Sequence, residues 1–324
     1  MCGFVGFVDF KNDVSSKKNI LLQMNSTLSK RGPDEDGTYI DKNVALAHKR
    51  LIVIDPEGGK QPMIQKYSYG EYVIVYNGQI YNTKELKEVL LENNFSFNGH
   101  CDTEVLLKAY IHYGSDVVHH LNGIFAFAIW NSRKKELFIA RDHFGVKPLF
   151  YTIKNGTLIF ASEIKAIFEY PGIEKVLNNE GICELFGIGP AHTPGTTIFK
   201  DIYEIRPAHC ATFNNYGLHI ERYWKLKSEE HRDSFGRTCS KVKFLLNDAI
   251  TRQLVSDVPL CTFLSGGLDS SIITKFAADY CQSNGLPPLD TYSIDYVDND
   301  KNFVKSDFQP NSDNYYIDLM LKNF

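Results

Sequence analysis

The sequence predicts two domains of different fold class, a layered α+β domain followed by the beginning of an α/β domain with a doubly wound parallel sheet. The length of 324 residues is typical of two domains of roughly 100–200 residues each. Over the first 220 residues, many short β-rich segments alternate with a few helical ones, as in layered α+β proteins. The later residues change to the order helix, strand, glycine-rich turn, helix and strand, which begins a doubly wound sheet.

Nine strands and three helices are expected in the first domain. The strands are short runs rich in β-branched and aromatic residues, at 4–9, 38–40, 44–47, 72–76, 124–130, 137–140, 149–152, 158–161 and 211–213. The helices each begin at a polar or capping residue and carry apolar residues three to four positions apart, at 17–29, 83–92 and 103–112.

A charged, mostly polar stretch at 225–237 is typical of an interdomain linker. After it we expect a helix at 233–255, a strand at 258–264, a helix at 270–280 and a strand near 291–294. The tail at 298–324 is polar and turn-rich, and we expect no closing element there.

The composition excludes several classes of protein. The 35 basic and 39 acidic residues give a net charge of −4 without a basic block, which argues against a nucleic-acid partner. Apolar runs such as 124–130 are far shorter than the roughly 18 residues of a membrane span. The seven cysteines include no C-x-x-C pair, which argues against a zinc knuckle or a disulfide framework. We therefore expect a cytoplasmic protein without a membrane partner.

Cys2 is the first candidate catalytic residue, because a small second residue permits removal of Met1. The mature chain would then carry a thiol and a free α-amine on one residue, and an N-terminal amine can act as the base for its own side chain. The amine titrates near about pH 8 and the thiol near about pH 8.5, so the proton transfer between them costs little. The alternative is that Cys2 is only a small buried apolar residue.

Three further positions could bind a substrate beside this thiol. The side-chain amide of Asn77 and the backbone N–H of Gly78, in an Asn-Gly turn at the end of a strand, could stabilise an oxyanion; a plain hairpin turn is the alternative. Arg50 could hold a carboxylate with its two-pronged guanidinium, or could be a solvated edge residue. Asp102 could be a counter-ion for an α-ammonium group, or could cap the helix that follows.

A second kind of site is predicted behind the strand at 258–264, in the sequence Ser265-Gly266-Gly267-Leu268-Asp269-Ser270-Ser271. Paired glycines let backbone N–H groups approach phosphates closely, the serines add hydroxyl donors, and the following helix directs its positive end at the same anion. The spacing and the lysine of a Walker loop are absent. Asp269 is the natural partner for Mg²⁺ carried by such phosphates, with an N-cap as its alternative role.

The motifs of the first half occur in one characteristic order: Cys2-Gly3, Arg31-Gly32-Pro33-Asp34, His48 to Asp55, Gly59-Lys60-Gln61-Pro62, Asn77 to Asn82, Asp102-Thr103-Glu104 and Ala140 to Leu149. This order resembles the class II glutamine amidotransferase domain over about residues 2–210. The resemblance implies an N-terminal-nucleophile fold of two stacked antiparallel sheets between helical layers.

The resemblance also implies roles for individual residues. Cys2 would be the nucleophile, and Asn77 with Gly78 would stabilise the oxyanion. The glutamine-binding residues would be Arg50, Leu51, Val53, Asn77, Gln79 and Asp102, with Arg50 on the carboxylate and Asp102 on the ammonium group. Family members carry a glutamate where Gln79 stands, so we expect a weaker glutamine site here.

The segment from Ser265 to Ser271 resembles the pyrophosphate loop of enzymes that cleave ATP to AMP and pyrophosphate. By that resemblance Leu264 and Ile294 would line the base, and Ser265, Gly266, Gly267, Asp269, Ser270 and Ser271 would hold the phosphates. ATP and Mg²⁺ would bind as a substrate complex, without a tightly bound prosthetic group.

The two halves together, including the segment at 193–200, resemble the family of glutamine-hydrolysing asparagine synthetases, which are ATP-dependent ligases. Glutamine hydrolysis at 2–210 would supply ammonia, across a connection at 211–237, to aspartate adenylated by the domain at 238–324. The expected partners are glutamine, ATP and aspartate, and a homodimer is allowed for.

The roughly 90 residues after the linker are too few for a complete adenylating domain. The chain is therefore expected to be truncated at its C-terminus and competent only in glutamine hydrolysis. Two alternatives are an ATP-dependent amidotransferase acting on another carboxylate, and a non-catalytic glutamine-binding or regulatory protein.

Overall fold

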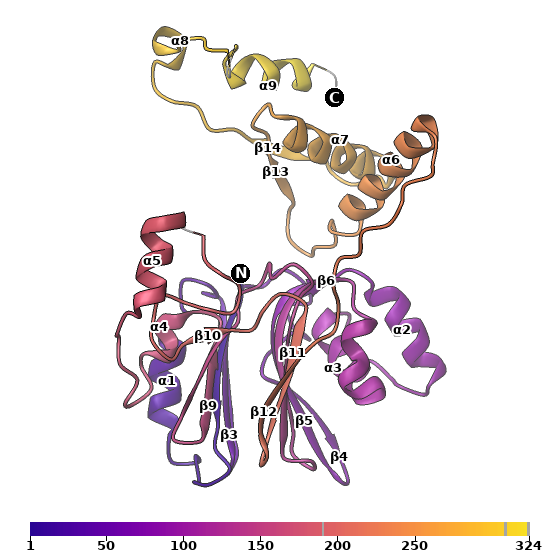
Figure 1. Cartoon of the computed structure of the whole chain (residues 1–324). Helices are drawn as coiled ribbons and strands as arrows, with labels where there is room; N and C mark the ends of the chain where they lie inside the picture. The colour runs from indigo at the N-terminus through magenta and orange to yellow at the C-terminus, as the bar shows by residue number, and fades with distance from the viewer. Residues whose placement is uncertain (190, 308–309, 323–324) are drawn as a thin grey trace. The chain divides into compact units, whose positions relative to one another are not determined.

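The computed structural model describes residues 1–189, 191–307 and 310–322, and the chain divides into two compact units (Figure 1). The first unit runs from Met1 to Ser228 and the second begins at Glu229. The predicted first domain ended at residue 210, whereas the first unit continues to Ser228, because a hairpin at 209–222 extends one of its sheets.

Two six-stranded antiparallel sheets form the first unit. The first sheet has the order β10 (Tyr203–Glu204), β8 (Phe150–Lys154), β9 (Thr157–Ala161), β1 (Gly3–Val8), β3 (Val44–Arg50) and β2 (Glu35–Ile40). The second has the order β12 (Gly217–Arg222), β11 (His209–Asn214), β7 (Glu136–Arg141), β6 (Gly123–Asn131), β5 (Gly70–Ile80) and β4 (Met63–Tyr67). Strand β1 is central in its sheet, between β9 and β3, so Cys2 directly precedes a fully buried strand.

The two sheets stack face to face, and helices cover both outer faces (Figure 1). Side chains on a strand alternate between its two faces. On β1, Phe4 and Val8 accordingly pack between the sheets, whereas Val5 and Phe7 pack against the helical layer of α1 (Lys18–Ser26) and α4 (Ile164–Ile167). The predicted layered architecture, with two antiparallel sheets between helices, is confirmed.

The second sheet is covered by α2 (Thr83–Glu92) and α3 (Asp102–Tyr113), followed by the short helix η1 (Gly114–His119). Leu90 of α2 and Leu106 of α3 are buried in one cluster with Ile74 and Phe127 of the sheet. The helix α5 (Asn179–Ile188) was not predicted, and most of its side chains are exposed.

The second unit contains α6 (Phe235–Thr251), β13 (Cys261–Phe263), α7 (Leu268–Ser283), β14 (Asp290–Tyr292), α8 (Asn299–Asn302) and α9 (Asp313–Leu321). Strands β13 and β14 are parallel and are joined through α7, which is the start of a doubly wound sheet. The tail was expected to be polar and turn-rich without a closing element, whereas α8 and α9 lie there and Ile317 of α9 is buried. No helix in the described part of the chain has both the length and the apolar character needed to cross a membrane.

Candidate active site

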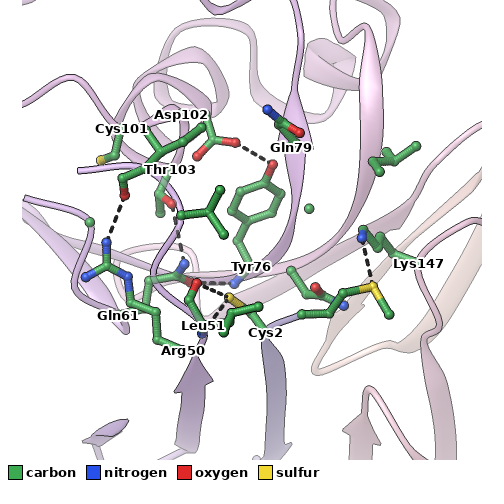
Figure 2. Close-up of a pocket in the computed structure, with 17 residues that line it drawn as sticks. Cys2, Arg50, Leu51, Gln61, Tyr76, Gln79, Cys101, Asp102, Thr103 and Lys147 are labelled. Carbon is green, nitrogen blue, oxygen red and sulfur yellow. Dashed lines mark hydrogen bonds between the residues drawn. The ribbon is translucent and has the colours of Figure 1, made fainter. Parts of the chain in front are cut away.

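A pocket of ≈ 180 Å³ lies where the C-terminal ends of β3 and β5 meet the residues before β1 and the start of α3 (Figure 2). Its lining includes all eight residues that the sequence assigned to the first site: Cys2, Arg50, Leu51, Val53, Asn77, Gly78, Gln79 and Asp102. These positions span 100 residues of sequence, and the stacking of the two sheets brings them together.

Cys2 is half-buried beside the loop that follows β3. The backbone N–H of Leu51 donates to its Sγ at 3.4 Å, and Sγ lies 3.6 Å from the carbonyl oxygen of Leu51. Burial raises the pKa of the Cys2 thiol, although the Leu51 contact and the nearby charges of the Met1 α-amine and Arg50 act in the opposite direction. A thiol with a raised pKa needs a base to become a nucleophile at neutral pH.

The predicted Asn-Gly turn at 77–78 is wrong, because β5 continues through both residues and pairs with β6 as far as Ile80 opposite Gly123. Glycine at position 78 serves a close approach between strands: a Cβ there would lie 2.3 Å from the carbonyl oxygen of Ile124. The dipeptide that is typical of a turn thus lies at a close approach between two backbones within a continuous strand.

The backbone N–H of Gly78 points away from β6 and toward the pocket. Phe125, which is opposite Gly78, directs its N–H to Asp142 Oδ2 at 3.2 Å and its C=O to the N–H of Asp142 at 2.8 Å, both on the far side of β6. Phe125 and Gly78 are therefore a non-hydrogen-bonded pair, in which the backbone groups of both residues face outward.

The neighbouring N–H groups on β5 show where this edge points. Two residues to either side of Gly78, the N–H of Tyr76 donates to Gln61 Oε1 at 2.7 Å and the N–H of Ile80 donates to Asp102 Oδ2 at 3.1 Å. Alternate residues of a strand direct their N–H groups to the same side. The N–H of Gly78 therefore lies between two donors that are already used, on the edge that lines the pocket.

Asn77 is buried, and its side chain lies between Cys2 and Arg31. With the amide oriented to satisfy both neighbours, Nδ2 donates to the carbonyl oxygen of Cys2 at 3.2 Å and Oδ1 accepts from Arg31 Nη2 at 3.3 Å. Arg31 also donates from Nε to the carbonyl oxygen of Cys2 at 2.9 Å. The amide of Asn77 is therefore held next to the residue that carries the thiol.

Asp102 is the first residue of α3, and its carboxylate faces β5 instead of capping the helix. Its Oδ2 accepts from the Tyr76 hydroxyl at 2.8 Å and from the N–H of Ile80 (Figure 2). Burial raises the pKa of Asp102, and these two hydrogen bonds partly offset that effect. Gln79 lies on the same side of the pocket as this carboxylate.

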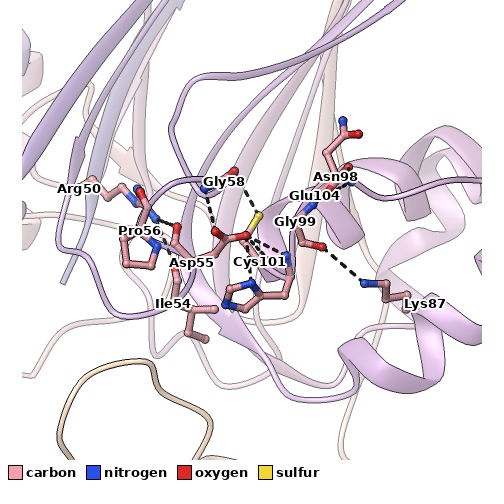
Figure 3. A network of polar contacts seen from close by, with 11 residues as sticks. Arg50, Ile54, Asp55, Pro56, Gly58, Lys87, Asn98, Gly99, Cys101 and Glu104 are labelled. Atoms are coloured by element: carbon pink, nitrogen blue, oxygen red, sulfur yellow. Dashed lines mark hydrogen bonds and ion pairs between the residues drawn. The ribbon is translucent and has the colours of Figure 1, made fainter.

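Arg50 ends β3 and is 4% exposed, so the alternative of a solvated edge residue is wrong. Its Nη1 pairs with Glu35 Oε2 at 2.7 Å and donates to Pro56 O at 3.0 Å, while Nη2 donates to Ile54 O at 3.0 Å and Asp55 O at 2.6 Å. The guanidinium therefore organises the loop at 51–59 (Figure 3).

The same loop is fixed from its other side by Asp55 (Figure 3). Its carboxylate accepts from the N–H of Gly58 at 2.8 Å, of His100 at 2.8 Å and of Cys101 at 3.1 Å, which joins the loop to the residues before α3. Burial favours the neutral carboxyl, but these hydrogen bonds prevail, and the pKa of Asp55 is lowered. A Cβ at Gly99 would lie 2.4 Å from Asp55 Oδ2, so glycine is needed for this approach.

Several pocket residues were not singled out from the sequence. Tyr76, Gln61 and Lys147 line the pocket, and Arg31 borders it. All four occur within or next to the quoted motifs, but their contacts join positions far apart in the chain. A spacing argument on a single segment cannot identify such contacts.

The second predicted site, in the second unit, is the loop between β13 and α7. The N–H of Ser265 donates to Ser270 Oγ at 3.3 Å, and Ser270 Oγ donates to Gly267 O at 3.1 Å, so the serines close the loop at the start of the helix. Gly266 has a φ of 78°, which favours glycine. Asp269 and Ser271 follow in the first turn of α7, and Asp269 is exposed.

Leu264 and Ile294 follow the ends of the parallel strands β13 and β14. Leu264 is buried and donates its N–H to Tyr292 O at 2.9 Å, whereas Ile294 is 79% exposed. Ligands of doubly wound sheets bind at this end of the strands. Within the described residues, no group of three or more His, Cys, Asp or Glu side chains could hold a metal ion.

Two family models match the chain. Residues 1–224 match the glutamine amidotransferase domain, and residues 241–324 match asparagine synthase. The chain is 52% identical over its whole length to glutamine-hydrolysing asparagine synthetase 3 of Bacillus subtilis, covering 53% of that protein. It is 31% identical to glutamine-hydrolysing asparagine synthetase B of Escherichia coli, with 86% of this chain and 45% of that protein covered.

The chain thus spans about half the length of the curated relatives that it matches. A solved structure of glutamine phosphoribosylpyrophosphate amidotransferase from Bacillus subtilis, complexed with ADP and GMP, superposes with a TM-score of 0.51 at 17% identity. That alignment covers 94% of this chain and 69% of the other. It supports the predicted fold class of the first unit.

Proposed function

Because the chain belongs to the glutamine amidotransferase domain family and continues into an asparagine synthase segment, we propose that the pocket around Cys2 hydrolyses glutamine to glutamate and ammonia. One observation carries this proposal: a thiol, an outward-pointing backbone N–H and a buried carboxylate line the same pocket, on Cys2, Gly78 and Asp102. These groups match the needs of amide hydrolysis, namely a nucleophile, an oxyanion donor and a counter-ion for the substrate.

The reaction begins after removal of Met1, when the α-amine of Cys2 accepts the proton of its own thiol. The sulfur then attacks the side-chain amide carbon of glutamine, and the tetrahedral oxyanion forms between the N–H of Gly78 and the amide of Asn77. Collapse breaks the C–N bond, and the protonated amine of Cys2 returns its proton to the departing nitrogen, which leaves as ammonia. Water hydrolyses the thioester to release glutamate and restore the thiol.

Glutamine would be held at its amino-acid end by the rest of the pocket. Asp102 is the candidate partner for the α-ammonium group, and Gln79, which lines the same pocket, is an uncharged candidate acceptor. Arg50 is the candidate partner for the α-carboxylate, but its guanidinium already binds Glu35 and three carbonyl oxygens. A two-pronged grip on a carboxylate by both Nη atoms would exchange some of these contacts, and Leu51 and Val53 lie on the loop that would move.

For the second unit, we propose that the loop from Ser265 to Ser271 binds the phosphates of ATP, with Asp269 beside its Mg²⁺. The ammonia would then be consumed by aspartate that ATP has adenylated, and asparagine would form with release of AMP. The support is the asparagine synthase match at 241–324 and the position of the loop between a strand and a helix N-terminus. We expect this chain by itself to hydrolyse glutamine without making asparagine.

The experiment is a pair of assays on the purified chain, with glutamate formation measured from glutamine and asparagine formation measured with ATP, Mg²⁺ and aspartate added. A glutamine-analogue electrophile should label Cys2, as shown by peptide mapping, and glutamine should protect against labelling. Cys183, Cys239 and Cys261 are exposed and provide internal controls for nonspecific alkylation. An unlabelled Cys2 together with no glutamate formation would contradict the proposal and favour a binding protein.

A further inference from the structure

Lys147 is a buried lysine at the edge of the pocket, in the turn that follows β7. Its side chain is 8% exposed, and its Nζ lies 3.2 Å from Met1 Sδ, on the residue before Cys2 (Figure 2). Within the described part of the chain, no carboxylate lies within ion-pair distance of this ammonium group. A buried charge without a counter-ion is costly, so a lysine at this position calls for a functional explanation.

Hydrogen bonds within the turn hold both the N–H and the carbonyl group of this lysine. The N–H of Lys147 donates to Asp142 Oδ2 at 2.9 Å, and its carbonyl oxygen accepts from Arg141 Nε at 2.8 Å. Arg141 is itself anchored by Glu204 at 2.9 Å. The backbone of Lys147 is therefore held in place, and its side chain extends to Met1, at the start of β1.

Two cations lie near the N-terminal residues, and they differ in whether a carboxylate neutralises their charge. Arg31 pairs with Glu163 at 3.0 Å, so part of its charge is neutralised. Lys147 has no such partner among the described residues and faces the residues that precede β1 directly. The charge of Lys147 is therefore the less neutralised of the two.

The other groups that face this region are Asp34 and Asp142 on the acidic side, and Arg31 on the basic side. Arg50 and Asp102 act on the thiol of Cys2 from the opposite wall of the pocket. Burial lowers the pKa of the α-amine of Met1, and the charges of Arg31 and Lys147 lower it further. Removal of Met1 frees the α-amine of Cys2, one residue along the chain. Arg31 contacts the backbone of Cys2, and Lys147 lines the same pocket as Cys2.

We propose that the ammonium group of Lys147, which has no carboxylate partner among the described residues, keeps the α-amine of the mature Cys2 neutral. Lys147 acts through Cys2 in this way and so sets the lower pH limit of the reaction. This inference rests on the proposed glutaminase function. A neutral amine can accept the thiol proton, whereas an ammonium group cannot.

Removal of the Lys147 charge should shift the pH dependence of activity to higher pH. Activity rises with pH as the α-amine loses its proton, and a nearby cation lowers the pH at which that happens. Replacing Lys147 by methionine, which has a similar length and no charge, should move this acidic limb of kcat/KM to higher pH. Because Cys2 is only half-buried, solvent screens its interaction with this charge, and one nearby unit charge corresponds to a shift of about 0.5–1 pH unit. Below the limb, activity should fall about three- to tenfold, with little change on the plateau.

The experiment measures the pH profile of glutamine hydrolysis for wild type, Lys147→Met, Lys147→Gln and Lys147→Arg. We expect both neutral variants to shift the limb upward and Lys147→Arg to retain the wild-type limb. Lys154→Met removes the same charge from the exposed end of β8, outside the pocket, and should leave the profile unchanged. A lower plateau or a higher KM with an unmoved limb in the neutral variants would overturn the proposal, since it indicates a structural or substrate-binding role.

A second measurement separates this proposal from the proposed function. The rate of Cys2 alkylation by iodoacetamide, followed on the N-terminal peptide against pH, needs no glutamine. If wild type does not hydrolyse glutamine, the proposed function fails, and the alkylation midpoint still tests Lys147. A higher midpoint in both Lys147→Met and Lys147→Gln supports the electrostatic role, and an unchanged midpoint overturns it.

Discussion

His48 Nε2 donates to the carbonyl oxygen of Tyr76 at 2.9 Å, and this bond joins β3 of the first sheet to β5 of the second. A carbonyl oxygen only accepts, so Nε2 carries the proton and Nδ1 is the unprotonated nitrogen. The bond lies one residue before Asn77, and His48 itself lies two residues before Arg50. A buried histidine therefore helps to hold in place the two strands that carry the candidate site.

We predict that His48 makes the first unit less stable in mild acid. Burial lowers the pKa of His48 to about 4, from an ordinary value of 6.5. Protonation then favours the unfolded chain, so this contribution to stability is present above about pH 6.5 and is lost as the pH falls toward 4. The loss amounts to at most about 3 kcal/mol.

The measurement is urea unfolding of wild type and His48→Gln at several pH values between 4.5 and 7.5. Both tryptophans, Trp130 and Trp224, belong to the first unit, so their fluorescence reports its unfolding. Glutamine can still donate to Tyr76 O but does not titrate. The stability deficit of the variant should shrink as the pH falls, and a deficit that is constant with pH would contradict the assignment.

We predict that Asn77→Ala lowers kcat for glutamine hydrolysis by about 10²–10³-fold with a small change in KM. The amide of Asn77 lies next to the backbone carbonyl of Cys2, and in the proposed mechanism it donates to the oxyanion of the transition state. Loss of a donor that acts only in the transition state lowers kcat and kcat/KM together. A variant that binds glutamine poorly but turns it over at the wild-type rate would place Asn77 in substrate binding instead.

We predict that Arg50→Lys raises KM for glutamine at least about tenfold and also loosens the loop at 51–59. A lysine cannot reproduce the four contacts that the guanidinium makes with Glu35 and the loop carbonyls. Limited proteolysis or amide exchange of the loop, compared with that of α2 as an internal reference, measures the second effect. A higher KM with an unchanged loop would show that Arg50 acts on the substrate alone.

The positions of the site residues in the chain could be predicted from local motifs, and their mutual arrangement could not. Residues 77 and 78 show the difference. As a dipeptide they are typical of a turn, yet the register of β5 on β6 keeps them in a strand, because Ile80 still pairs with Gly123. Strand register depends on the partner strand, which a single segment does not reveal.

The contacts of Lys147 and His48 were not predictable for a related reason. Lys147 contacts Met1 across 146 positions, and His48 contacts Tyr76 across 28. Both contacts depend on the order of the strands within the two sheets, which no single segment of sequence reveals. By contrast, Phe4, Val5, Phe7 and Val8 could be assigned as a strand from the sequence, because their alternation between two buried faces is a local property.

The last prediction concerns Gln79, which lines the same pocket as the buried carboxylate of Asp102. Replacement by glutamate adds a second negative charge where an α-ammonium group is expected. In the bound state the cation offsets the repulsion between the two carboxylates, so Gln79→Glu should lower KM for glutamine about three- to tenfold near neutral pH. The same change should raise the pKa of Asp102 in the free protein, because two like charges then share one pocket. The gain in affinity should therefore decrease as the pH falls toward 5.

Inhibition constants for glutamate and for a glutamine analogue lacking the amino group provide the control, because only ligands with an ammonium group should bind more tightly. Equal tightening for both would show that residue 79 acts on the shape of the pocket and not on the ammonium charge.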